Sequence, residues 1–91
     1  MSIYLIILQM SNEDRRLQMV HCIKEDRQWA RITDNVWCVK ENEITKTADM
    51  RENLNSKLQI QSSEKLMVLN ITKSAWASYN LPKEVADWLK E

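Results

Sequence analysis

The chain has 91 residues and not one glycine. Loops that hold nucleotide phosphates need glycine, because glycine alone lets the backbone approach a phosphate closely and takes positive φ without a steric penalty. The absence therefore excludes a P-loop and a dinucleotide-binding fold. Turns in this chain must use Asn, Asp and Ser instead.

An excess of charge is also lacking, because thirteen Lys and Arg balance thirteen Asp and Glu. No global field draws such a chain to nucleic acid or to an anionic membrane, although a local patch remains open. The apolar run at residues 3–8 is shorter than a signal-peptide core and follows no Lys or Arg, and no run reaches membrane-spanning length. We expect a cytoplasmic protein without a membrane partner.

Metal-ligating and nucleophilic side chains are scarce. Cys22 and Cys38 are the only cysteines, far apart and outside a CxxC arrangement, and His21 is the only histidine. Buried, reduced thiols are therefore expected in place of a disulfide or a zinc site. A His21–Cys22 nucleophile pair is disfavoured, since helical neighbours point about 100° apart. We expect no resident metal and no small-molecule cofactor.

What the chain does contain is a regular series of amphipathic segments, enough for a single domain over residues 1–91. Apolar and β-branched runs predict strands at residues 3–9, 29–33, 36–39 and 65–71. Helical spacing of apolar residues predicts helices at about residues 12–25, from Thr45 or Thr47 to Leu58, and after Pro82.

Local signals predict where these elements begin and turn. Ser11 followed by Asp14 resembles a capping box for the first helix. Asp34 and Asn35 are suited to the positive φ of a two-residue hairpin turn. Thr45 or Thr47 is expected to cap the second helix.

The order strand, helix, strand, strand, helix, strand, helix consists of two split βαβ units and a short closing helix. It predicts a ferredoxin-like α/β fold of the α+β sandwich type, with two helices on one face of a four-stranded antiparallel sheet. The opposite sheet face then needs another cover.

The first strand is apolar on both faces of that sheet. Its side chains alternate between two sets, one of Tyr4, Ile6 and Leu8 and the other of Ile3, Leu5 and Ile7. The strand at residues 65–71 repeats the pattern. The closing helix covers part of the second face, and a second copy of the chain is expected to cover the rest.

We therefore predict a homodimer, with an interface that includes Tyr4, Ile6, Leu8, Trp37 and Trp88; which of the two sheet faces forms the dimer stays open from sequence. The four tryptophans of the chain also suit a stacking platform for single-stranded bases. Packing in the core and at the interface is the favoured interpretation, because the chain has no Phe and Trp is its large apolar side chain.

The whole chain resembles the small CRISPR-associated Cas-two proteins and their SinR-like relatives. "IYLIILQM" matches the first strand of that family, "DNVWCV" the third, and "LPKEVADWLKE" the terminal helix of the SinR-like branch. The resemblance rests on the order and spacing of these segments and implies a ferredoxin-like fold and a symmetric dimer. In Cas-two proteins the first strand ends in an aspartate, assigned to metal binding and phosphodiester cleavage, whereas this chain has Gln9 there.

A neutral amide is a poor substitute for a carboxylate at a Mg²⁺ site, since it brings a dipole but no formal charge. Glu13 and Asp14 lie nearby in sequence, but acidic residues are also routine in the first turn of a helix. Arg15, Arg16 and Arg31 are the candidate phosphate contacts. Arginines without a wider basic stripe are, however, typical of a solvated face.

Three functions remain open from sequence. The favoured one is a non-catalytic, homodimeric Cas-two-like module that binds nucleic acid or a protein partner. The alternative is a metal-dependent endonuclease of DNA or RNA that uses Glu13 or Asp14 with Mg²⁺ or Mn²⁺. A stand-alone dimer in a toxin–antitoxin or phage-defence system is the third, on fold analogy alone.

Overall fold

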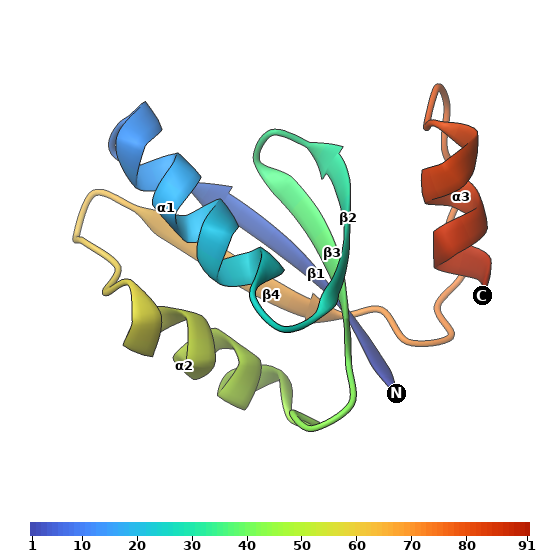
Figure 1. Ribbon diagram of the computed structural model, residues 1–91, viewed down its shortest axis with the longest axis horizontal. Helices are drawn as coiled ribbons and strands as arrows, with labels where there is room; N and C mark the ends of the chain where they lie inside the picture. Colours follow the sequence, from blue (N-terminus) through green and yellow to red (C-terminus); the bar gives the residue numbers. More distant parts are fainter.

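The computed structural model describes all residues from 1 to 91 and has an α+β architecture (Figure 1). Its elements in chain order are β1 (Ser2–Gln9), α1 (Glu13–Lys24), β2 (Gln28–Thr33), β3 (Val36–Glu41), α2 (Thr47–Lys57), β4 (Lys65–Asn70) and α3 (Lys83–Lys90). This βαββαβ order with a closing helix confirms the predicted ferredoxin-like fold class. None of the helices has the length and apolar composition that a bilayer crossing requires.

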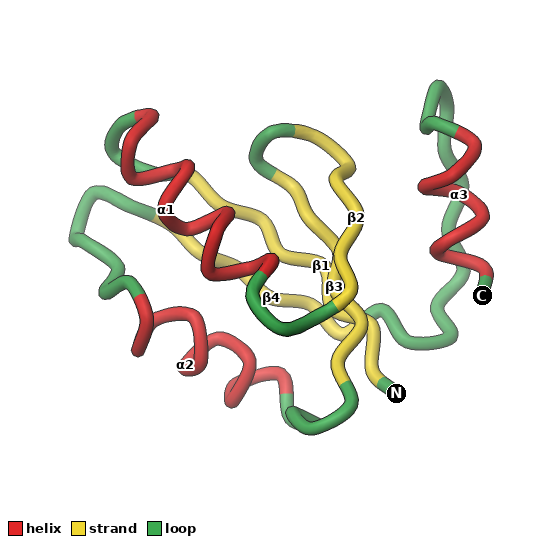
Figure 2. Tube along the Cα trace, viewed as in Figure 1, coloured by secondary structure: helices red, strands yellow, loops and turns green.

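The four strands form one antiparallel sheet in the order β2-β3-β1-β4. β1 is central and pairs with β3 on one side and β4 on the other, so Ile6 lies opposite both Trp37 and Val68. β2 and β4 are the two edges. Figure 2 shows α1 and α2 together on one side of the strands and α3 apart from them.

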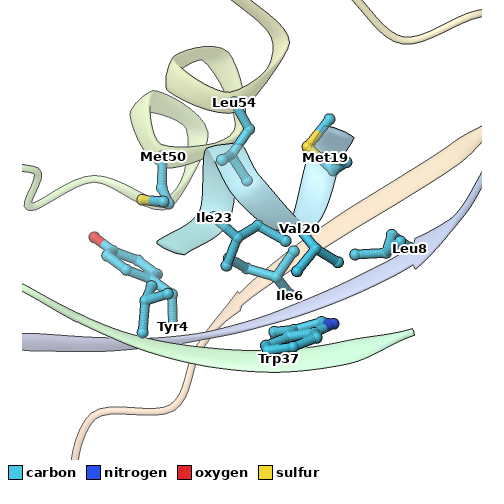
Figure 3. Packing of buried hydrophobic residues seen from close by; sticks show 10 residues of the cluster. Tyr4, Ile6, Leu8, Met19, Val20, Ile23, Trp37, Met50 and Leu54 are labelled. Atoms are coloured by element: carbon cyan, nitrogen blue, oxygen red, sulfur yellow. The ribbon is translucent and has the colours of Figure 1, made fainter. Parts of the chain in front are cut away.

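The core lies between the sheet and the pair α1 and α2. Side chains of β1 and β3 point toward α1 and α2 and pack against the side chains that the two helices direct toward the sheet (Figure 3). The buried apolar cluster consists of Tyr4, Ile6, Leu8, Met19, Val20, Ile23, Trp37, Val39, Met50 and Leu54. Spacings of three and four residues bring Met19, Val20 and Ile23 to one face of α1, as expected for an amphipathic helix.

This core corrects the predicted dimer interface. Tyr4 and Ile6 are 0% exposed, Leu8 2% and Trp37 4%, all within one chain. They are unavailable to a second copy, because α1 and α2 already cover them. The face that α1 and α2 leave free carries the other set, Ile3, Leu5 and Ile7.

The helix starts differ from the sequence prediction. Asn12 caps α1, its side chain accepting a hydrogen bond from the Arg15 amide at 2.9 Å. Ser11 does not cap, because its hydroxyl and its amide both donate to the Glu64 carboxylate. The N-cap of α2 is Lys46 and has no capping side chain, since Thr47 is already helical.

The β2–β3 hairpin is present, but its turn is not the predicted type. Asp34 and Asn35 do not have positive φ; the residues that do are Asp26, Lys73 and Asn80. A register shift between Arg31 and Thr33 supplies local twist to the hairpin, so a mirror-image turn is not needed. The Asn35 amide donates to Thr33 Oγ1 at 3.2 Å and closes the turn.

Candidate interaction surface

The sheet face opposite α1 and α2 is covered only in part, and α3 is the cover. Lys40 of β3 points to this side, where its Nζ donates to the Trp88 carbonyl oxygen at 2.7 Å. The same ammonium lies 4.4 Å from the centre of the Trp88 ring. Ala30, Cys38 and Lys40 are all at most 6% exposed on this face. Trp88 is thus half-buried against its own chain.

The other half of that face, over β1 and β4, is uncovered. Ile7 is 37% exposed, Met67 59% and Leu69 38%. Ile7 pairs directly with Met67 across the strands, and Leu69 follows two residues along β4 on the same face. We call Ile7, Met67 and Leu69 the β1–β4 patch. Large apolar side chains gathered in this way are typical of an interface.

Gln9 lies at the end of β1, exposed, and borders a shallow cavity with Glu13, Arg16 and Asn35. Glu13 is held by Arg16 in an ion pair, and the hydrogen bond from Arg16 lowers the pKa of the Glu13 carboxyl. Asp14 is exposed in the first turn of α1. Nowhere in the chain do three His, Cys, Asp or Glu side chains come together as metal ligands. These residues do not fit a Mg²⁺ site within one chain, because only Glu13 and Asp14 bring a carboxylate and Arg16 already binds Glu13.

Arg15 faces away from that cavity and toward Glu64. Its Nη2 donates to Glu64 Oε1 at 2.7 Å and to the Gln59 carbonyl oxygen at 2.8 Å. The Glu64 side chain is completely enclosed and the Arg15 side chain is only 18% exposed. The hydrogen bond from Arg15 holds the pKa of the Glu64 carboxyl far below its usual range. Arg15 is therefore committed to an internal ion pair.

Arg16 and Arg31 are brought together by the β2–β3 turn. Arg16 Nη1 donates to the Asp34 carbonyl oxygen at 3.0 Å, and Arg31 Nη2 lies 3.5 Å from the Asp34 carboxylate. The three arginines singled out from sequence thus do not form one surface. Each of them has an acidic neighbour in the chain, so no uncompensated basic stripe results.

Two tryptophans meet beside α1. The rings of Trp29 and Trp37 have centroids 5.7 Å apart, and Lys24 Nζ lies 4.2 Å from the Trp29 centroid. Trp37 is buried and donates its indole N–H to the Asp34 carbonyl oxygen. Trp29 remains 42% exposed on edge strand β2. Trp37 therefore packs in the core, and Trp29 leaves one aromatic ring at the surface.

Sequence reasoning missed Glu64 and Lys40, the two buried residues with charged side chains. Glu64 accepts hydrogen bonds from Ser11, Arg15 and the Gln61 amide. Neither residue stands in a pattern that signals burial, because each partner is distant in sequence. Only the tertiary structure brings them together.

Comparison of the chain with protein-family models, curated proteins and solved structures finds no match. The fold class therefore rests on the structure itself. Any family membership or function is a proposal.

Proposed function

We propose that the chain is a non-catalytic, homodimeric binding module of the Cas-two-like type, with the β1–β4 patch as its dimer contact. The β1–β4 patch is the observation that supports this most directly. Three large apolar side chains on one sheet face lose contact with water when a second copy covers them, and this stabilises the dimer by roughly 25 cal/mol per Å² of apolar surface buried.

In a twofold dimer the same patch of both copies forms the contact, and an uncharged apolar patch can meet its own copy without charge repulsion. α3 limits the contact to the β1 and β4 side, since it occupies the β2 and β3 side. The predicted interface thus moves from Tyr4, Ile6 and Leu8 to the opposite face of the same strand.

The non-catalytic part of the proposal is supported by the neutral Gln9 and by the ion pair that engages Glu13. The partner of the dimer is a protein or a nucleic acid. Since the arginines have acidic neighbours, we expect nucleic-acid binding to be weak and to fall steeply with added salt. Fluorescence anisotropy with labelled single-stranded and double-stranded oligonucleotides over a salt series measures this.

The assembly is tested by light scattering on the purified protein at micromolar concentration. The expected mass is twice the protomer mass of 10.8 kDa. Met67→Glu and Ile7→Glu should shift the protein to monomer, because each places a charge in the β1–β4 patch. Leu17→Glu is the matched control, since Leu17 is also exposed but lies on α1. A monomeric wild type, or a dimer indifferent to both patch variants, contradicts the proposal.

A further inference from the structure

β2 is an edge strand, so the backbone N–H and C=O groups of every second residue point away from the sheet. The Leu8 amide donates to the Asn35 carbonyl oxygen at 2.9 Å. This hydrogen bond shows which residues of β3 direct their backbone groups toward β1. In an antiparallel strand, the backbone N–H and C=O groups of successive residues point to opposite neighbouring strands. The backbone groups of Cys38 therefore point to β2 and pair with those of Ala30. It follows that Trp29 and Arg31 direct their N–H and C=O groups outward.

No other part of the chain satisfies those outward groups. β2 pairs with β3 alone, and the backbone hydrogen bonds outside the regular elements all lie elsewhere. An exposed row of this kind is a template for another strand. The register shift after Arg31 limits the usable length to the first part of β2.

A groove runs beside this edge, between β2 and α3. Its volume is about 670 Å³. Its apolar lining residues are Trp29, Ala30, Ile32, Val85 and Trp88, together with Pro82. A strand flanked by a helix, with a groove between them, is the arrangement in which added peptide strands bind: the backbone gives affinity and alternate side chains fill the groove.

The charges of the groove argue for a peptide over a nucleic acid. Arg31 borders the groove from β2 and Glu84 borders it from α3. The Arg31 side chain, 59% exposed, lies on the α1 side of the sheet, because Arg31 pairs with Trp37, whose side chain is in the core. Asp34 lies 3.5 Å from Arg31. Phosphates meet no net positive charge here, whereas an added strand with an acidic side chain on one face and a basic side chain on the other complements Arg31 and Glu84.

We propose that the β2 edge binds an extended peptide segment of another protein as an added strand. Apolar side chains at every second position of the peptide enter the groove against Val85 and Trp88. An acidic side chain at an intervening position lies beside Arg31 on the α1 side of the sheet, and a basic side chain lies beside Glu84 of α3. The inference goes beyond the proposed function, because β2 is the sheet edge farthest from the β1–β4 patch.

The experiment selects binders from a display library of random dodecapeptides on the full chain, then measures their affinity by fluorescence anisotropy. Arg31→Pro removes one outward N–H without breaking a bond to β3, since proline is tolerated at such edge positions. It should weaken binding about tenfold. Arg31→Ala is the matched control, because it also loses the guanidinium but keeps the N–H; it should lose only the preference for an acidic residue.

Val85→Glu provides a second variant that leaves the strand intact and places a charge inside the groove. It should abolish binding, a larger effect than that of Arg31→Pro, whereas Lys83→Glu, on the exposed side of α3, should leave binding unchanged. Circular dichroism checks that each variant is folded. Failure to enrich any alternating apolar peptide, or equal binding by wild type and Val85→Glu, overturns the proposal. Light scattering on the same samples reports the dimer separately.

Discussion

The Arg15 guanidinium and the Glu64 carboxylate face each other through two hydrogen bonds, Nε to Oε2 at 3.1 Å and Nη2 to Oε1 at 2.7 Å. The same carboxylate accepts from the Ser11 amide at 3.1 Å and from the Gln61 amide at 2.9 Å. Because these donors belong to the β1–α1 loop, α1 and the α2–β4 loop, one carboxylate connects three segments. A bidentate, enclosed pair of this kind resists solvent screening.

Protonation of Glu64 in acid is expected to lower the free energy of unfolding. Its pKa is lowered from an ordinary 4.5, so its stabilisation is fully present above that pH and declines as the pH falls toward the folded-state pKa. Glu64→Gln should lower the melting temperature at neutral pH and flatten the loss of stability in acid. Thermal unfolding followed by circular dichroism between neutral and acidic pH measures both effects.

The Glu13–Arg16 pair offers a matched control for that experiment. Its carboxylate is also hydrogen-bonded to an arginine, but the Glu13 side chain is 68% exposed. Glu13→Gln should change the melting temperature little, as expected for surface ion pairs. Equal effects of the two substitutions would show that enclosure of Glu64 is unimportant.

The two thiols should differ in reactivity. Burial raises the pKa of Cys38 to about 11 and also raises the pKa of Cys22, which is only half-buried. We expect Cys22 to react first with a disulfide reagent at mildly alkaline pH, and Cys38 to react only after unfolding. Trp88→Ala should expose Cys38 by loosening α3. Rapid reaction of Cys38 in the folded wild type would mean that α3 does not cover the sheet.

Packing of α2 is tested with two leucines of opposite exposure. Leu54 is 0% exposed in the core, whereas Leu17 on α1 is 53% exposed. Leu54→Ala should lower the free energy of unfolding by about 2–5 kcal/mol, since it leaves a cavity. Leu17→Ala should change it by no more than about 0.5 kcal/mol. Urea denaturation of both variants gives the two values.

The wild type is expected to cleave neither DNA nor RNA with Mg²⁺ or Mn²⁺. Gln9 supplies no charge, and Glu13 is engaged by Arg16. A nuclease assay with and without metal should include Gln9→Asp, Glu13→Ala and Asp14→Ala. Cleavage by the wild type that disappears in either alanine variant would establish the endonuclease alternative. Cleavage gained only by Gln9→Asp would identify this residue as the missing part of the site.

The order and type of the elements were predictable from sequence, because each apolar period is local. The two faces of β1 were predictable from the alternation of its side chains. One face carries Tyr4, Ile6 and Leu8, and the other carries Ile3, Leu5 and Ile7. Which set lies under the helices was not predictable, since both are equally apolar and only tertiary packing distinguishes them. The same limit applies to the site: the arginines were visible, but Glu64, the distant partner of Arg15, was not.

The central position of β1 also bears on synthesis of the chain. β1 is made before both of its neighbours, β3 and β4, which end at residues 41 and 70. At roughly 5–20 residues per second, an emerging β1 waits for several seconds with both apolar faces and both edges unpaired. During that interval the nascent strand exposes the kind of apolar surface and unpaired edge that chaperones protect from aggregation.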